Sequence, residues 1–418
     1  MHKSIFTQLI LAAILLCLFS FTLAEDYTLG KCFQLAVSRS ETLADQEEQV
    51  IQAEEHFKQA QSSNLPNISG LFSYTKQDQG TDLTNIKLTA SQPLFHGFRI
   101  INAIKQNEKL LKTKQEAYQW AYLQIYSDVS TAYYLLVYAI KDKQLLEEQQ
   151  KLYEKRLQEL NERLQIGRSR KTEILSFEVS MALLKTTISQ IDSQILAAKT
   201  YLGFLLGVEA TISLSEENSA LLPPTKDLAY YKERMALRPD IKAAQSTLAG
   251  SAIGIELASS SQWLPAVDLN GNFYVQHAAP NQNVAWDAQI LFTLPTFFGY
   301  NGQSKTDEAT SIKRQAEIAL AKLQRKTAQD IEDVYNLLAA EKAQIQSLTK
   351  AVELSETNVQ TVLADYRYGL SNNLDVLQAL NAAIDIKRSL NKLRYAYKTD
   401  AAKLASLVVD IPSVGGTK

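Results

Sequence analysis

The chain has 418 residues, a formal net charge of −2 and 46% hydrophobic residues. Without an excess of basic charge it carries no electrostatic footprint for nucleic acid, so we expect no nucleic-acid partner. The apolar content is high enough to bury a core, which excludes an intrinsically disordered chain.

The first predicted element is a secretory signal peptide at residues 1–24. A short basic start precedes an apolar run over residues 9–21, and small residues lead to a cleavage point after Ala24. The alternative is a membrane anchor that is retained. Cys17 is not expected to carry a lipid, because the bulky Leu16 stands where a small residue is needed.

The mature chain would then contain one cysteine, Cys32, so it can form no intrachain disulfide. No other stretch approaches about 18 consecutive apolar residues, the length that a transmembrane helix needs. We therefore expect a fold that is held by packing and has no membrane-spanning helix.

The elements of the first half follow in order. A helix is expected at roughly 28–63, then two strands at 68–74 and 86–90. The 69 residues between Gly97 and Gly167 contain neither glycine nor proline. As one helix they would span roughly 100 Å. A last helix follows Gly167.

The second half repeats this order. A helix is expected at roughly 227–261, then strands at 267–275 and 284–294. The 66 residues between Gly302 and Gly369 again lack glycine and proline. A final helix follows Gly369, so each half predicts the same series of elements.

Landmarks recur between the halves at offsets of 198 to 202 residues. The pairs are Leu43 with Ile241, Pro66 with Pro265, Pro93 with Pro295 and Gly167 with Gly369. Four anchors in the same order indicate a tandem duplication. We therefore divide the chain into a first repeat (25–210), a linker (211–226), a second repeat (227–411) and a C-terminal tail (412–418).

Both long helices carry a seam with alternating steps of three and four residues. Its positions are Lys143, Leu146, Gln150, Tyr153, Leu157, Leu160 and Leu164 in the first half, and Ile345, Leu348, Val352, Ser355, Val359, Val362 and Tyr366 in the second. This period predicts coiled-coil packing against other helices.

The predicted strands alternate apolar and polar residues over about ten positions, the length of a tilted strand in an outer membrane. Aromatic residues gather where strands meet helices, at Phe95, Phe98, Trp263, Phe297, Phe298 and Tyr300. The alternative is a pair of half-buried hairpins in a soluble sheet. In lipid, four strands leave open edges, so membrane insertion would require several chains to pool their strands.

The order of elements resembles the TolC-like outer-membrane efflux family over essentially the whole mature chain. The stretches that carry the resemblance are "YTLGKCFQLAVSRSETL", "SQPLFHGF", "LQIGRSRKTEILSFE" and "YRYGLSNNLDVLQAL". The resemblance implies a mainly α fold with membrane β structure. It implies a homotrimer with a long coiled-coil helical tunnel and a shared barrel of 12 strands in the outer membrane, four from each chain.

The resemblance also implies where the functional residues lie. Gly167 and Gly369 would form two helix-hairpin turns at a periplasmic entrance. The gate would be formed by Tyr366, Asp375, Glu173 and Arg170. The adaptor-docking turns would be Ile166, Gly167, Arg168 and Ser169, and Tyr368, Gly369, Leu370 and Ser371.

Two departures from the family pattern affect the gate. Ser371 stands where some members carry a basic residue, and Gln378 where some carry a second carboxylate. Positive charge collects instead on the first turn, at Arg168, Arg170 and Lys171. A pair between Arg170 and Asp375 is a candidate replacement for the family's salt-bridge lock.

No enzyme chemistry is visible in the sequence. The four histidines are scattered, and neither a metal-ligand cluster nor a phosphate-binding glycine loop is present. We expect no cofactor and no catalysis. The leading hypothesis is a passive duct that serves a tripartite efflux or type I secretion system, with a periplasmic adaptor and an inner-membrane pump or ABC transporter as partners and outer-membrane lipid around its barrel.

Two other classes of protein remain as alternatives. One is a soluble periplasmic adaptor or scaffold built on coiled-coil hairpins. The other is a filament-forming coiled-coil protein. An adaptor would need one hairpin and a glycine-rich second domain, and a filament would need neither strands nor a signal peptide.

Overall fold

The computed structural model describes most of the chain. The described residues are 26–78, 82–208, 213–214, 226–277, 284–294 and 300–411. The predicted signal peptide and the C-terminal tail lie outside the described residues, as does most of the predicted linker.

The chain forms two compact units, and each takes segments from both predicted repeats. The helical unit comprises the described residues of 1–40, 123–231 and 331–418. The sheet unit comprises those of 41–122 and 232–330. The predicted division into two repeats therefore describes the order of the sequence, while packing groups the chain in another way.

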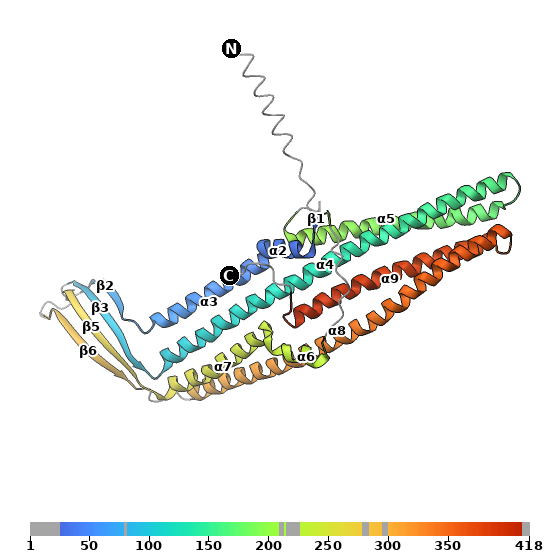
Figure 1. Ribbon diagram of the computed structural model, residues 1–418. Helices are drawn as coiled ribbons and strands as arrows, with labels where there is room; N and C mark the ends of the chain where they lie inside the picture. The colour runs from blue at the N-terminus through green and yellow to red at the C-terminus, as the bar shows by residue number, and fades with distance from the viewer. Residues whose placement is uncertain are drawn as a thin grey trace, which may run out of the picture. The chain divides into compact units, whose positions relative to one another are not determined.

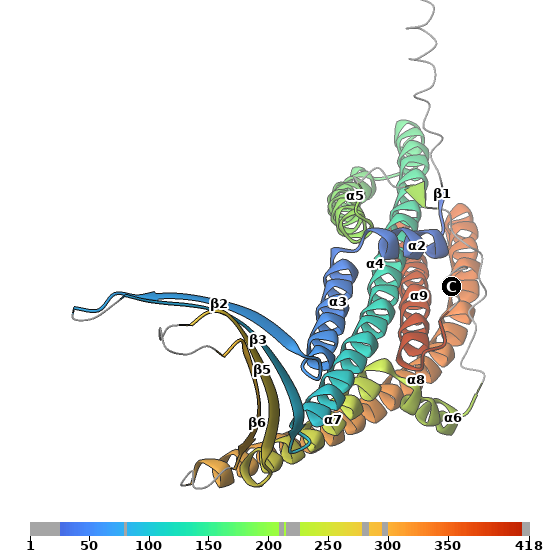
Figure 2. The same ribbon diagram turned by 90° about the vertical axis from the view of Figure 1, so that its left-hand side faces the viewer.

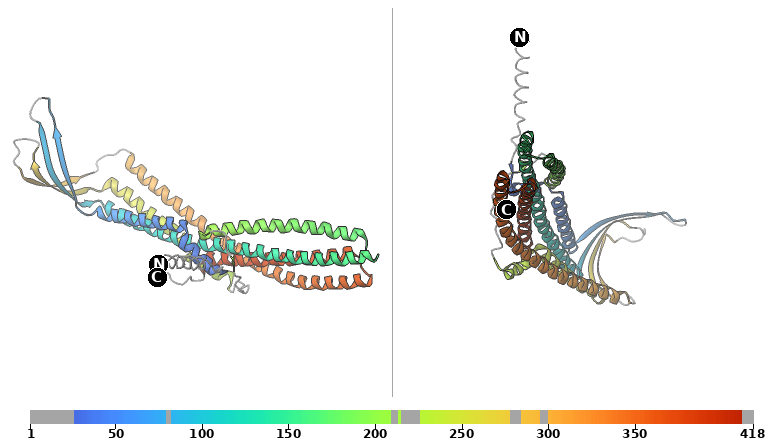
Figure 3. Two further views of the ribbon diagram at one scale, coloured as in Figure 1. Left: turned by 90° about the horizontal axis from the view of Figure 1, so that it is seen from above. Right: turned by 90° about the vertical axis from the view of Figure 1, so that its right-hand side faces the viewer.

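The long helices are confirmed. Helix α4 (Arg99–Gln165) has 67 residues and α8 (Asn301–Tyr368) has 68. Each turns back into a shorter helix, α5 (Lys171–Leu206) and α9 (Asn373–Leu407). Figure 1 shows the two resulting hairpins, α4 with α5 and α8 with α9, and the left-hand view of Figure 3 shows each helix running beside its partner.

The predicted first helix of each half is broken, so the expectation of one continuous helix was wrong. In the first half, α2 (Leu29–Arg39) and α3 (Glu41–Ser62) meet at Ser40, whose backbone is extended. In the second half, α6 (Leu228–Glu233) passes into a 3₁₀ turn (Arg234–Leu237) and then into α7 (Pro239–Trp263). Proline opens α7 at its first position, and a residue before proline is driven out of the helical region.

The heptad seam predicted for α4 is confirmed in part: three of its positions are buried in the helical unit, whereas Leu164 is exposed. Leu146, Tyr153 and Leu160 lie seven residues apart and are almost fully buried. The Tyr153 ring meets Phe177 of α5 edge to face, with 5.4 Å between ring centroids. Seven-residue spacing keeps the same face of a helix toward its neighbour, so this seam joins the two arms of the first hairpin.

The four predicted strands form one antiparallel sheet in the sheet unit. They are β2 (Asn67–Thr75), β3 (Leu83–His96), β5 (Ala266–Gln276) and β6 (Trp286–Thr293), in the order β2-β3-β5-β6. The central pair, β3 with β5, joins the two predicted repeats. Figure 2 shows the strands side by side and curled in one direction.

A short parallel pair was not predicted. In the helical unit, β1 (Asp26–Tyr27) pairs with β4 (Ser213–Leu214). The second strand of this pair lies in the predicted linker. Two-residue strands leave no periodic signal, so only the tertiary structure brings them together.

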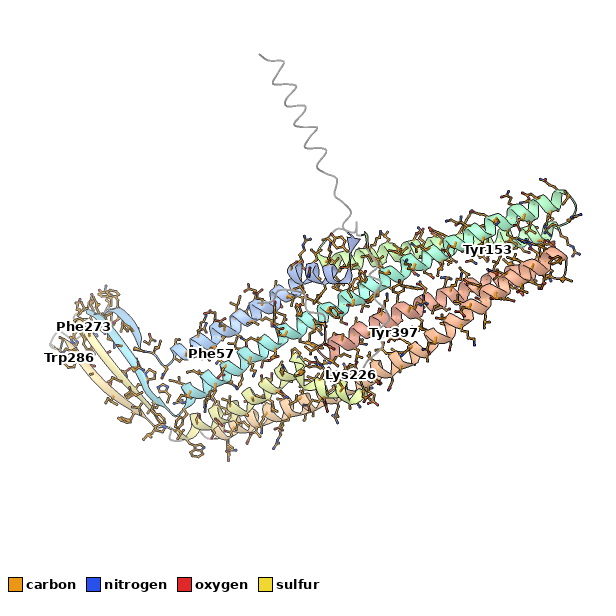
Figure 4. All side chains as sticks on the ribbon, in the orientation of Figure 1. Phe57, Tyr153, Lys226, Phe273, Trp286 and Tyr397 are labelled. Carbon is orange, nitrogen blue, oxygen red and sulfur yellow. The ribbon has the colours of Figure 1, made fainter. Side chains whose placement is uncertain are left out.

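The register gives the sheet two different faces. Residues aligned on one face are apolar: Ile68, Gly70, Phe72, Tyr74, Ile86, Leu88, Ala90, Val267, Leu269, Gly271, Phe273, Trp286, Ala288, Ile290 and Phe292. The other face carries mostly polar residues, among them Ser69, Thr89, Asn272 and Asp287 in one row. Many large side chains of the apolar face are exposed, including Trp286 at 67% and Phe72 at 69%. Figure 4 labels Phe273 and Trp286, neighbours across β5 and β6.

Part of the predicted aromatic cluster is confirmed at the end of the sheet. Phe95 and Phe98 meet edge to face, with 5.4 Å between ring centroids. Trp263 and Tyr300 are strongly exposed. Phe297 and Phe298 lie outside the described residues.

Candidate functional site at the two hairpin turns

The two hairpin turns have the same backbone geometry. Gly167 and Gly369 adopt φ values of +73° and +76°, a left-handed conformation that glycine enters without penalty. In the first turn the Gly167 amide donates to the Leu164 carbonyl at 3.0 Å, and the Arg168 amide donates to the Arg163 carbonyl at 2.8 Å.

The second turn repeats both hydrogen bonds 202 residues later. The Gly369 amide donates to the Tyr366 carbonyl at 3.2 Å, and the Leu370 amide to the Asp365 carbonyl at 2.8 Å. Both turns are therefore Schellman motifs, in which the carbonyls at the end of a helix are satisfied by the residues just past it. The duplicated glycines have a shared structural purpose.

Large apolar side chains project from the turns. Ile166 is 66% exposed, Tyr368 is 82% exposed and Leu370 is 77% exposed. Exposed apolar groups that gather at one place on a protein mark sites of interaction with another protein or a membrane. These residues belong to the predicted docking turns.

The helix that follows each turn begins in a different way. At the second turn, Asn372 caps α9 in a reciprocal capping box: its side chain accepts from the Asp375 amide, and the Asp375 carboxylate accepts from the Asn372 amide, both at 3.0 Å. At the first turn, Arg170 occupies the cap of α5 and makes no side-chain capping bond. Glu173 instead accepts a hydrogen bond from the Ser169 hydroxyl at 2.9 Å.

Tyr366 is buried beneath two arginines of α4. It is 8% exposed, and the guanidinium carbons of Arg156 and Arg163 lie 4.1 Å and 4.9 Å from its ring centroid. Arg156 is itself only 5% exposed and donates to Asn373 Oδ1 of α9, at 3.1 Å from its closer nitrogen, and to Glu159 at 2.8 Å. Tyr366 thus joins the last turn of α8 to α4 through cation–π contacts.

A row of polar contacts continues this connection along α4 and α9. Arg388 holds the fully buried Asp142 with two hydrogen bonds of 2.9 Å. Further toward the turns, Gln149 and Tyr153 both donate to Asn381 Oδ1. Because buried polar groups need specific partners, these pairs set the register between the two hairpins.

The structure places the four predicted gate residues at or beside the two turns, and among the described residues no side-chain contact joins one of them to another. Within the chain, Asp375 and Glu173 are each bound in their own turn, and Tyr366 meets neither of them. Among the described residues no ion pair joins Arg170 to Asp375. The proposed pairing of these two residues is therefore absent within one chain.

Sequence reasoning missed Arg156, Arg163 and Asn373. On a long polar helix an arginine is typical of a solvated face, and nothing local marks it as buried. The one available signal is that Arg156 and Arg163 lie seven residues apart and so share a helix face. Their partners lie about two hundred residues away in the sequence, and the periodicity of one helix does not identify its partners in a distant helix.

Two further features were considered: side-chain groups that could bind a metal ion, and helices that could span a membrane. Over the part of the chain that the structure describes, no group of His, Cys, Asp and Glu side chains is arranged to hold a metal ion. Over the same residues, no helix combines the length and apolar character needed to cross a bilayer.

Two long helical hairpins with glycine turns and an antiparallel sheet with one mainly apolar face are the features that one chain combines here. The chain belongs to the outer membrane efflux protein family, whose sequence model matches residues 32–208 and 230–408.

Known relatives support this assignment. The chain is 21% identical over 327 residues to the cation efflux system protein CusC of Escherichia coli, covering 76% of this chain and 71% of CusC. It is 22% identical over 340 residues to the alkaline protease secretion protein AprF of Pseudomonas aeruginosa, covering 79% of this chain and 70% of AprF. The crystal structure of CusC superposes with a TM-score of 0.83 at 18% identity over 93% of each chain.

Family membership places the protein in the outer membrane as a channel for efflux or secretion. The expected fold class, mainly helical with a four-stranded membrane sheet, is confirmed. Neither the family nor the fold supports a soluble periplasmic adaptor. The family is one of channel proteins rather than enzymes.

Proposed function

We propose that the protein is the passive outer-membrane exit duct of a tripartite efflux or type I secretion system. Its cargo is delivered by an inner-membrane pump or ABC transporter through a periplasmic adaptor. The observation that carries this proposal is the sheet, because its predominantly apolar face suits lipid and its polar face suits a water-filled lumen.

The proposal includes a homotrimer. In the described sheet, β2 and β6 are the edge strands. An unpaired edge is not tolerated in lipid, and four strands are too few to close a barrel alone. Three chains would contribute four strands each, and pairing β6 of one copy with β2 of the next would close a 12-stranded barrel. The exposed Trp263 and Tyr300 suit the lipid headgroup region.

The hairpin turns form the periplasmic entrance in this proposal. Tyr366, held under Arg156 and Arg163, keeps the end of α8 against α4 in the closed state. Glu173 and Asp375 are repeated by the threefold symmetry and provide carboxylates at the entrance, where they favour cations over anions. Arg170 forms no ion pair among the described residues, and in the trimer it would pair with a neighbouring copy.

The adaptor docks on the exposed residues of the turns. Ile166 of the first turn and Tyr368 and Leu370 of the second provide apolar contacts. Arg168 and the neighbouring Ser169 border the first contact, and Ser371 borders the second. The chain matches relatives named for cation efflux and for protease secretion, so we infer that the transporter and not the duct selects the cargo.

The test is the native mass and conductance of the protein extracted from outer membranes in detergent. We expect three times the mass of the mature chain and ion conductance in planar bilayers. A monomer that stays soluble without detergent would overturn the proposal. For docking, a photo-crosslinking amino acid at Tyr368 should capture an adaptor in cells, whereas one at the exposed Glu353 of α8 should not.

A further inference from the structure

An acidic residue occupies a core position of α8. Ile331, Val334, Leu338, Glu341 and Ile345 follow one another at alternating steps of three and four residues. The four apolar members are at most 8% exposed, and Glu341 is 5% exposed. Since a residue at this spacing faces the neighbouring helices, the Glu341 carboxyl lies inside the helical unit.

One oxygen of the Glu341 carboxyl, Oε2, is buried and makes no hydrogen bond within the part of the chain that the structure describes. Among the described residues it forms no ion pair with a lysine or arginine. A buried carboxylate without such a partner is strongly disfavoured, so this position selects the neutral acid.

The titratable groups near Glu341 come from two other elements. Asp400 and Tyr397 face it from α9, and Tyr397, labelled in Figure 4, is only 2% exposed. Tyr231 of α6 interacts with Tyr397. Among the described residues, the cation that acts on Asp400 is Lys403. The surroundings of Glu341 are therefore acidic or neutral.

These surroundings shift the proton affinity of both carboxyls upward. Burial, with a smaller contribution from the Asp400 charge, raises the pKa of Glu341 from 4.5 to about 7. Burial also raises the pKa of Asp400 above its ordinary value. The geometry and the titration agree, because an unpartnered acid in an apolar seam holds its proton.

We propose that Glu341, together with Asp400, forms a proton-binding element in the seam between α8 and α9, which packs tightly when Glu341 is protonated and loosens when it ionises. This element is separate from the turns and from the sheet. It lies on the two helices that end at the second turn, so it acts on the arms of the second hairpin.

The pH dependence has a definite sign. The folded chain keeps the Glu341 proton up to about pH 7, whereas the unfolded chain releases it near 4.5. Unfolding therefore releases a proton between these values, and raising the pH through this window favours the unfolded chain. Above about 7 both states are ionised, and this contribution becomes constant.

The experiment compares thermal unfolding of the full mature protein in detergent at about pH 5 and about pH 8. Glu341→Gln removes the titration while it keeps the shape of the side chain. Glu353→Gln is the matched control, because it makes the same change at an exposed position of α8. Between about pH 5 and about pH 8, we expect the melting temperatures of the wild type and of the control to fall by about 3 °C more than the melting temperature of Glu341→Gln.

Equal pH dependence of the melting temperature in the wild type and in Glu341→Gln would overturn the proposal. That result is expected if a neighbouring copy supplies a cation to the ionised carboxylate.

Asp400→Asn gives a second check. Removing the Asp400 charge should lower the pH at which the stability of the protein changes, and an unchanged pH would remove Asp400 from the element. These measurements do not depend on the duct function. A conductance measurement at about pH 8 does depend on the duct function. In that measurement we expect the Glu341→Gln channel to be open less often than the wild-type channel.

Discussion

The first and second hairpin turns share a backbone and differ in their side chains. Both use a left-handed glycine and the same two hydrogen bonds. Leu164, exposed at the end of α4, corresponds to the buried Tyr366 at the end of α8, and Arg170, which makes no capping bond, corresponds to the capping Asn372. After duplication, the main-chain requirement of a tight helix reversal was retained at both places, while side chains diverged toward different contacts.

The difference gives the two turns different roles. The second turn is capped and tied to α4 through Tyr366, so it is the more tightly held of the two. The first turn carries Arg168, Arg170 and Lys171 on its exposed surface without an ion pair in the described chain. We expect substitutions of buried residues to destabilise the second turn more than the first. We expect the first turn to interact more strongly with charged groups outside its own chain.

The largest effect is expected for Arg156→Met. This change removes the cation over Tyr366 and two hydrogen bonds to Asn373, and should destabilise the protein by about 3 kcal/mol. It should also increase conductance in planar bilayers, because the end of α8 is released. Arg163→Met is the comparison, with an expected loss of about 1 kcal/mol because its guanidinium is farther from the ring. Equal losses for the two arginines would contradict this ranking.

The glycines provide the sharpest test of shared geometry. Gly167→Ala and Gly369→Ala should each cost about 1–2 kcal/mol, because alanine is strained at positive φ. An added Cβ meets nothing within 4 Å at either position, so backbone strain alone sets the cost. Unfolding followed by circular dichroism should give the same loss for both. A difference of more than about 1 kcal/mol would show that the turns are not equivalent.

The smallest effects are expected at the helix caps. Asn372→Ala removes the capping box of α9 and should cost about 1 kcal/mol, whereas Arg170→Ala should be nearly neutral because Arg170 makes no capping bond. Arg170→Asn introduces a capping side chain and should stabilise α5 by a few tenths of a kcal/mol or more. Urea unfolding of the three variants checks the order. A large loss for Arg170→Ala would reveal a contact of Arg170 with a neighbouring copy.

Much of the fold was predictable because it rests on local periodicity. The absence of glycine and proline between Gly97 and Gly167 predicted α4 to within two residues at each end. Alternation of apolar and polar residues predicted all four strands of the membrane sheet. The breaks at Ser40 and before Pro239 were missed, since the flanking helical pattern continued across them.

The candidate site was less predictable. The turns were located by their glycines, and Tyr366 by its resemblance to a family position. Its arginine partners were not found, because the seven-residue spacing of Arg156 and Arg163 in α4 does not show which residue of α8 they contact. The buried Glu341 was also missed, although it stands one seam step before Ile345, where an apolar residue is expected.

The sequence alone determined the elements that depend on neighbouring residues: helix length, strand alternation, glycine turns and the duplicated order. The tertiary structure decided which long-range groups meet, as when Arg388 binds Asp142 or β3 pairs with β5. The physical reason is the range of the interactions. Backbone hydrogen bonding and side-chain periodicity act within a few residues, whereas burial and pairing of polar groups depend on which helices and strands pack together.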